Sequence, residues 1–133
     1  AGVALLGAAS GRLIWELDDQ PAVGRYLHEL LTGEGYQVVV FDTPQRLLDA
    51  FAVQGDIVAA LITDLTMPGM GGLALADQVH RRQPALPIFL CTGNGEGLDA
   101  TELAARGIRQ VFRKPLDNGT LLQALADAWL APR

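Results

Sequence analysis

The chain alternates two hydrophobic patterns along its length. Short apolar runs predict buried strands, and segments in which apolar positions recur every three or four residues predict amphipathic helices. The expected strands cover residues 12–17, 37–41, 57–63, 87–91 and 110–113, and the expected helices cover residues 21–33, 44–53, 73–82, 99–106 and 118–129. Five β-α units in succession predict an α/β fold, with a doubly wound five-stranded parallel sheet and helices on both faces.

Residues that favour helix ends support these boundaries. Thr43 before Pro44 is typical of an N-cap and a first turn, and Asn118 is expected to cap the last helix. Gly33 and Gly107 follow the last periodic residues of their helices, where glycine commonly ends a helix.

The stretch from Ala59 to Gly72, A-A-L-I-T-D-L-T-M-P-G-M-G-G, takes a buried strand to a carboxylate and then into a tight loop. Polar residues also end the other expected strands. If all strands are parallel, their carboxyl ends share one edge of the sheet, where ligands bind in such folds. Five polar side chains are then expected to converge there: Asp18, Asp19, Asp64, Thr92 and Lys114.

The charges at this edge predict a metal site. Three neighbouring carboxylates repel one another unless a cation neutralises them, and Mg²⁺ suits carboxylate, water and phosphate oxygens. Lys114 is the one lysine beside nine arginines. A compact ammonium fits a crowded metal and phosphate pocket better than a wide guanidinium, and Thr92 adds a hydroxyl donor for a phosphoryl oxygen.

Composition narrows the function further. At 133 residues, 50% of them hydrophobic, the chain suits one domain. Its net charge of −5 and its lack of a basic run argue against nucleic acid or an anionic membrane as partner, and favour a protein or a metal-held anion. The single Cys91 in an apolar run indicates a buried thiol and a reducing, cytoplasmic location.

The ends of the chain contain few residues that indicate structure or function. Residues 1–11 are interpreted as a linker or cloning residue and 12–131 as the domain. The first residues lack the basic start of a signal peptide, and no apolar run is long enough to span a membrane. Because the chain begins with Ala, we expect a piece of a longer protein.

Four motifs in order resemble a known family: L-D-D at 17–19, D-L-T-M-P-G-M-G-G at 64–72, C-T-G at 91–93 and R-K-P-L at 113–116. Together they resemble the receiver domain of two-component response regulators, over nearly everything after residue 11. The resemblance implies a flavodoxin-like sheet of strand order 2-1-3-4-5.

The resemblance also implies a set of roles. Asp64 would be the phosphoacceptor, taking a phosphoryl group from a histidine kinase or a histidine phosphotransfer domain and switching partner affinity. Mg²⁺ would be held by Asp18, Asp19, Asp64 and the backbone carbonyl of Thr66. Thr92 would be the switch hydroxyl, and Lys114 would bind the phosphate and precede a cis bond to Pro115. The domain would catalyse its own phosphotransfer and dephosphorylation.

Several origins and functions remain open. Segments such as L-P-I-F-L-C-T-G (86–93) are similar to receivers at the end of hybrid sensor histidine kinases, an origin we favour over a stand-alone single-domain regulator. An aspartate-nucleophile phosphatase of haloacid dehalogenase type ranks lower, because its D-x-D-x-T signature needs Asp where Thr66 stands. An inert docking receiver is disfavoured by the intact acidic triplet.

Some positions depart from the family or carry no assigned role. Val111 stands where many receivers have a switching Tyr or Phe, so we expect a signal to travel through Thr92 and the Gly93–Gly97 loop instead. Glu16 is a charge in a buried strand, expected either to reach a gap between helices or to pair with an arginine. His28 and His80 are interpreted as surface residues without a metal partner.

Overall fold

A five-stranded parallel sheet forms the centre of the structure, a computed structural model that describes residues 9–67, 69–93 and 97–130. The strands are β1 (Leu13–Leu17), β2 (Gln37–Phe41), β3 (Ala60–Asp64), β4 (Ile88–Thr92) and β5 (Ile108–Arg113). They lie in the order β2-β1-β3-β4-β5, and every neighbouring pair is parallel. The predicted fold class and strand order are confirmed.

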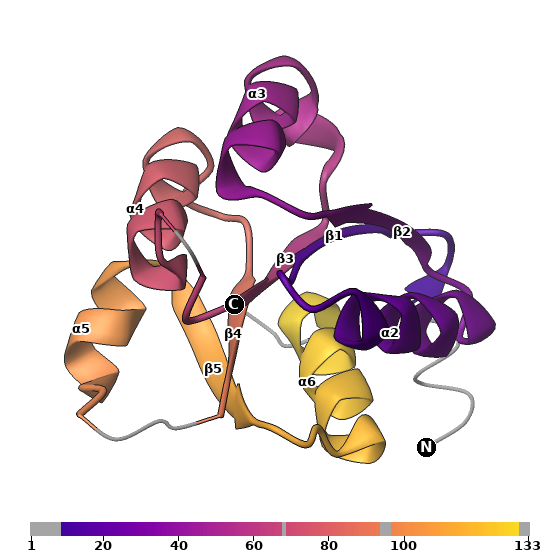
Figure 1. Cartoon of the computed structure of the whole chain (residues 1–133). Coiled ribbons are helices and arrows are strands. Elements are labelled where there is room, and N and C mark those ends of the chain that lie inside the picture. Colours follow the sequence, from indigo (N-terminus) through magenta and orange to yellow (C-terminus); the bar gives the residue numbers. More distant parts are fainter. Residues whose placement is uncertain (1–8, 68, 94–96, 131–133) are drawn as a thin grey trace.

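Helices cover both faces of this sheet (Figure 1). The helices are α2 (Pro21–Gly33), α3 (Pro44–Gln54), α4 (Gly72–Arg82), α5 (Ala100–Ala105) and α6 (Asn118–Leu130), and a 3₁₀ turn η1 covers Gly55–Ile57. Helices α2 and α6 lie on one face, and α3, α4 and α5 lie on the other. This is the alternation that successive right-handed β-α-β crossovers produce.

Two apolar clusters fill the spaces between the sheet and its helices. On the α2 and α6 side, the strands contribute Ile14, Ile62, Phe89, Cys91 and Phe112. On the other side they contribute Trp15, Leu17, Leu61, Ile88, Leu90 and Ile108. Since consecutive strand residues point to opposite faces, β3 and β4 are buried on both sides and hold no exposed residue.

The fifth strand begins at Ile108, two residues earlier than expected, and two further element ends differ for local reasons. The third strand begins at Ala60 rather than residue 57, because Gly55–Ile57 turns as η1 against the ring of Phe51. The last helix is capped by Asp117 rather than Asn118: an Asp117 carboxylate oxygen accepts the Thr120 N–H at 2.8 Å. Thr43 caps α3 as predicted, accepting the Arg46 N–H at 3.2 Å.

Gly72 allows the first turn of α4 to pack directly against the end of β3. Its N–H donates to the Leu65 carbonyl at 2.8 Å, and a Cβ added at this position would lie 2.3 Å from the Asp64 carbonyl oxygen. No side chain larger than hydrogen fits there without a shift of the backbone.

We therefore expect Gly72→Ala to lower the free energy of unfolding by about 1–3 kcal/mol, the usual cost of overpacking. Urea unfolding followed by circular dichroism measures this change. Gly33→Ala is the matched control, because nothing lies within 4 Å of its added Cβ. An equal stability of the two variants would contradict the close packing at Gly72.

Candidate functional site

The carboxyl ends of four strands bring the expected site residues to one edge of the sheet. Asp18 and Asp19 follow β1, Asp64 and Thr92 are the last residues of β3 and β4, and Lys114 follows β5. Backbone hydrogen bonds continue past the strand ends, with Leu65 N–H donating to the Cys91 carbonyl and Lys114 N–H to the Thr92 carbonyl, both at 2.8 Å. The peptide bond between Lys114 and Pro115 is cis.

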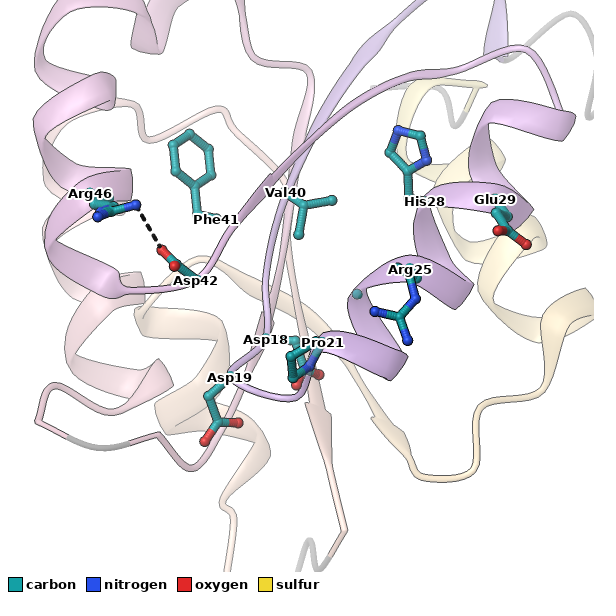
Figure 2. A pocket seen from close by; sticks show the side chains of 11 residues that line it. Asp18, Asp19, Pro21, Arg25, His28, Glu29, Val40, Phe41, Asp42 and Arg46 are labelled. Carbon is teal, nitrogen blue, oxygen red and sulfur yellow. Dashed lines mark ion pairs between the residues drawn. The ribbon is translucent and has the colours of Figure 1, made fainter.

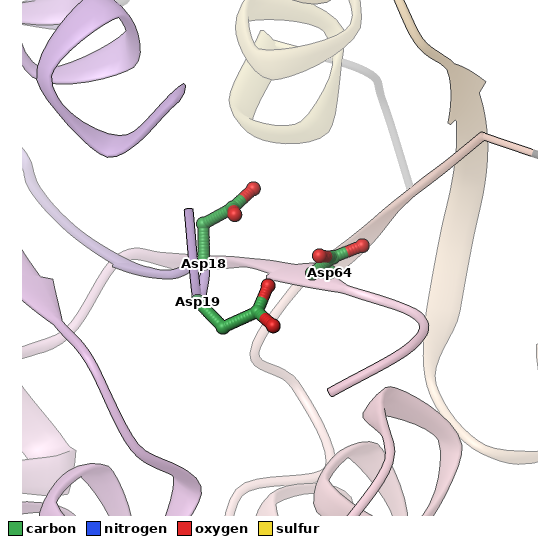
Figure 3. Close-up of side chains that lie close together, drawn as sticks. All are labelled: Asp18, Asp19 and Asp64. Atoms are coloured by element: carbon green, nitrogen blue, oxygen red, sulfur yellow. The ribbon is translucent and has the colours of Figure 1, made fainter. Parts of the chain in front are cut away.

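The three aspartates form an acidic cluster (Figure 3). One carboxylate oxygen from each of Asp18, Asp19 and Asp64 lies within 4.8 Å of the other two. Asp18 and Asp64 are buried, whereas Asp19 is exposed. Water screens Asp19 from its neighbours far better than it screens the other two carboxylates.

The Lys114 ammonium lies between the two buried carboxylates. Its Nζ is 3.3 Å from Asp18 Oδ2 and 3.3 Å from Asp64 Oδ2. The other Asp18 oxygen, Oδ1, accepts the Gln20 N–H at 2.8 Å. One lysine thus joins β5 to both acidic strand ends through charge-assisted contacts.

The pKa values of Asp64 and Lys114 respond to this crowding. Burial raises the pKa of the Asp64 carboxyl, and the Asp18 charge raises it further, against the lowering effect of Lys114. Burial lowers the pKa of the Lys114 ammonium, but the charges of Asp18 and Asp64 outweigh burial and raise it. The negative charges of the cluster therefore attract cations and stabilise the protonated form of Lys114.

A hollow of about 470 Å³ gives access to this cluster. Its lining holds most of the expected site residues, Gly93 of the C-T-G motif, and one residue that the motifs did not include, Gln20. The full set is Asp19, Gln20, Asp64, Thr66, Thr92, Gly93 and Lys114. Gln20 was missed because it acts through its backbone N–H, which any residue type offers. The expected loop extends to residues 94–96, which lie outside the described residues, as does Pro68.

A larger hollow, of about 650 Å³, lies beside the cluster between α2 and β2 (Figure 2). Asp18 and Asp19 lie at one end of it, Arg25 and His28 come from α2, and an ion pair joins Arg46 to Asp42. Its lining includes neither Asp64 nor Lys114. The smaller hollow is therefore the one in which a ligand could meet both residues.

The residues of the cluster fit a hard divalent cation. Every side chain in it offers carboxylate oxygen and none offers sulfur or imidazole, which is the donor set of Mg²⁺ and Ca²⁺ rather than Zn²⁺. Thr66, the fourth expected ligand, lines the same hollow. The acidic cluster could thus hold a metal.

Glu16 is buried without a hydrogen-bonding partner for either carboxylate oxygen among the described residues. Its side chain is 1% exposed, so the expected pairing with an arginine is not found. Burial, followed by the Asp18 charge, raises the pKa of Glu16 to about 8. Glu16 is therefore a protonated acid in the folded protein at neutral pH.

This protonation makes stability depend on pH. Between the ordinary pKa of 4.5 and about 8, the folded state holds a proton that the unfolded state has lost, so the stabilisation is complete below that window and falls as pH rises through it. Glu16→Gln, which is always neutral, should gain in stability relative to wild type by up to about 4 kcal/mol between pH 5 and pH 8. Urea unfolding with EDTA at both pH values measures this gain, and a pH-independent difference would contradict it.

The remaining titratable candidates lie away from this edge. His28 is exposed, as expected, but His80 is half-buried, so its assignment to the surface is wrong. The Nδ1 atom of His80 is buried against Gly107 and has no hydrogen-bond partner among the described residues. Val111 and Phe112 are adjacent in β5, so they face opposite sides of the sheet and pack into different clusters.

The doubly wound sheet, with an acidic cluster and one lysine at its carboxyl edge, is the architecture of receiver domains. The profile of the response regulator receiver domain matches residues 14–126, and the chain belongs to this family. It is thus a domain of two-component signal transduction.

Individual relatives agree with this assignment. The DNA-binding transcriptional regulator NtrC of Klebsiella pneumoniae is 32% identical over 105 residues, which are 79% of this chain and 22% of that protein. The transcriptional regulatory protein FixJ of Bradyrhizobium diazoefficiens is 30% identical over 86% of this chain and 55% of its own length. The chain therefore spans between 22% and 55% of these two regulators.

A solved structure shows the same fold. The signal receiver domain of an HD domain-containing protein from Pseudomonas fluorescens Pf-5 has a TM-score of 0.79 and 26% identity, covering 87% of this chain and 92% of that domain. Among the described residues, no helix combines the length and the apolar character needed to cross a membrane.

Proposed function

We propose that Asp64 is the phosphoacceptor of this receiver domain and takes its phosphoryl group from a phosphohistidine. The observation that carries the proposal is the position of the Asp64 carboxylate, which lies 3.3 Å from the Lys114 ammonium and lines an open hollow. The donor would be a histidine kinase or a histidine phosphotransfer domain. The net charge of −5 favours such a protein partner over nucleic acid or a membrane.

In the proposed reaction, an oxygen of the Asp64 carboxylate attacks the phosphorus atom of the phosphohistidine. An O–P bond forms, the N–P bond breaks, and the electron pair of that bond returns to the imidazole of the donor. The Lys114 ammonium is placed to bind an oxygen of the transferring group, and Thr92 lines the same hollow, where its hydroxyl could donate to another oxygen. Their contribution is position and charge rather than covalent chemistry.

A bound Mg²⁺ would neutralise charge on the phosphoryl oxygens as they approach the carboxylates. The residues that would hold it are Asp18, Asp19, Asp64 and the backbone carbonyl of Thr66. The oxygen-only donor set supports Mg²⁺. Asp19 is the exposed member of the cluster and is therefore the side chain most free to turn toward an incoming ion.

Two features bear on the protein to which the domain belongs. The relatives NtrC and FixJ are transcriptional regulators longer than this chain, which supports a receiver within a larger protein. We propose a hybrid sensor histidine kinase as that protein, with a stand-alone regulator as the second candidate. The buried Cys91 thiol supports a reducing, cytoplasmic location.

Acetyl phosphate, a small phosphoryl donor, tests the phosphoacceptor role directly. With Mg²⁺ present, wild type should gain the mass of one phosphoryl group, and Asp64→Asn should gain none, because it has lost the nucleophilic oxygen. Intact-mass spectrometry measures both. Labelling that persists in Asp64→Asn, or that a chelator does not reduce, would contradict the proposal.

Substitutions of Asp19 and Lys114 should affect different steps, metal binding and phosphoryl transfer. Asp19→Ala removes one expected ligand, so Mg²⁺ should bind about tenfold more weakly in a calorimetric titration. Lys114→Arg keeps the charge but replaces the compact ammonium by a wide fork, so it should fold normally and accept phosphoryl groups more slowly. Wild-type behaviour of either variant would remove that residue from the site.

A further inference from the structure

Helix α5 is weakly attached to the rest of the domain. It has six residues, and none of them is buried. Helices this short are unstable without contacts to other elements. Leu103 is partly buried against the cluster that contains α4, and α5 also contacts the neighbouring strand β5. The position of α5 thus depends on a few residues.

Arg106, the residue that ends α5, makes the connection to α4. Its Nη1 lies 2.7 Å from Asp77 Oδ2 and 3.3 Å from the Leu73 carbonyl oxygen, both in α4. Its Nη2 lies 3.3 Å from Glu102 Oε1 in α5 itself. The Arg106 side chain is 27% exposed, so these contacts are partly shielded from water.

A second contact fixes the turn that follows. Gly107 has a φ of +82°, and a Cβ added there would lie 2.4 Å from His80 Nδ1. The glycine therefore allows the turn between α5 and β5 to lie directly against α4. Arg106 and Gly107 together attach the carboxyl end of α5 to that helix.

One of the two α4 residues that hold Arg106, Leu73, follows the glycine that packs against the candidate phosphoacceptor. Leu73 follows Gly72, whose hydrogen atom faces the Asp64 carbonyl oxygen and whose N–H binds the Leu65 carbonyl. A shift of the backbone at Asp64 toward Gly72 would therefore push against the first turn of α4, because the two backbones already pack closely there. The Leu73 carbonyl is in that turn.

We propose that Arg106 is a coupling residue, which holds α5 against the first turn of α4 and transmits changes at Asp64 to α5. The route uses backbone contacts and one arginine, and needs no aromatic ring at position 111. The first half of the proposal, that Arg106 attaches α5 to α4, concerns the unphosphorylated protein. The second half, that Arg106 transmits a change, rests on the proposed phosphorylation of Asp64.

Amide hydrogen exchange tests the attachment. In EDTA, Arg106→Met should raise the exchange rates of amides in residues 100–106 by about three- to tenfold, with amides of β3 unchanged. Glu102→Gln, which keeps both contacts to α4, and Arg46→Met, which removes a surface arginine of α3, should change them less than about twofold. Unchanged exchange in α5 of Arg106→Met would overturn the proposal.

Beryllofluoride with Mg²⁺, a mimic of the phosphoryl group, tests the transmission. Fluorine NMR reports whether it binds, and amide exchange reports the response of α5. Wild type should show a change of exchange in residues 100–106, and Arg106→Met should show less than half of that change with beryllofluoride bound. An equal response in both proteins would overturn the coupling role alone, whereas no bound beryllofluoride in wild type would contradict the phosphoacceptor proposal as well.

Discussion

The contact of the Lys114 ammonium with two buried carboxylates is the interaction on which the site depends. Asp18 and Asp64 come from different strands, and their largely buried carboxylates would repel each other. Lys114 Nζ lies 3.3 Å from an oxygen of each. The lysine therefore allows both strand ends to keep their negative charges close together, which is the arrangement that holds a divalent cation.

The parallel sheet is what delivers these charges to one place. A residue that ends one strand lies beside the last or next-to-last residue of the next strand, whatever their separation in sequence: Asp64 is paired with Cys91, and Thr92 with Arg113. Hydrogen bonds from Leu65 to Cys91 and from Lys114 to Thr92 continue this order beyond the strands. The hydrogen-bonded backbone of the sheet thus positions the site residues, and their side chains only reach from the strand ends to the site.

The same regularity explains how much of the molecule could be predicted from sequence. In the part of the chain that the structure describes, hydrophobic period and helix-end residues identified β1 to β5 and α2 to α6, and strand ends identified Asp18, Asp19, Asp64, Thr92 and Lys114. Details set by tertiary packing could not be predicted. Asp117 and Asn118 are both good caps, and the path of the chain after Pro115 decides between them. Nothing in the sequence showed that Glu16 would lie buried without a partner.

The glycines after Asp64 show most clearly what could not be predicted from the sequence. In the sequence, nothing distinguishes Gly69, Gly71 and Gly72, because all three belong to the loop that ends the strand. In the structure Gly69 has open space around it, whereas Gly72 has no room for a side chain. The difference matters because contact at Gly72 makes the end of β3 and the start of α4 one mechanical unit.

The contact between the end of β3 and the start of α4 bears on the role of Val111. Val111 is half-buried in the cluster that also contains Leu73 of α4 and Leu103 of α5, so it packs against the elements that would move. A stiff β-branched side chain there fills space in one conformation and offers no alternative position for itself. Because protein interiors are close-packed, the coupling proposed above would act by displacing neighbouring elements rather than single side chains. The short, unburied helix α5 is the element that such a displacement moves at least cost.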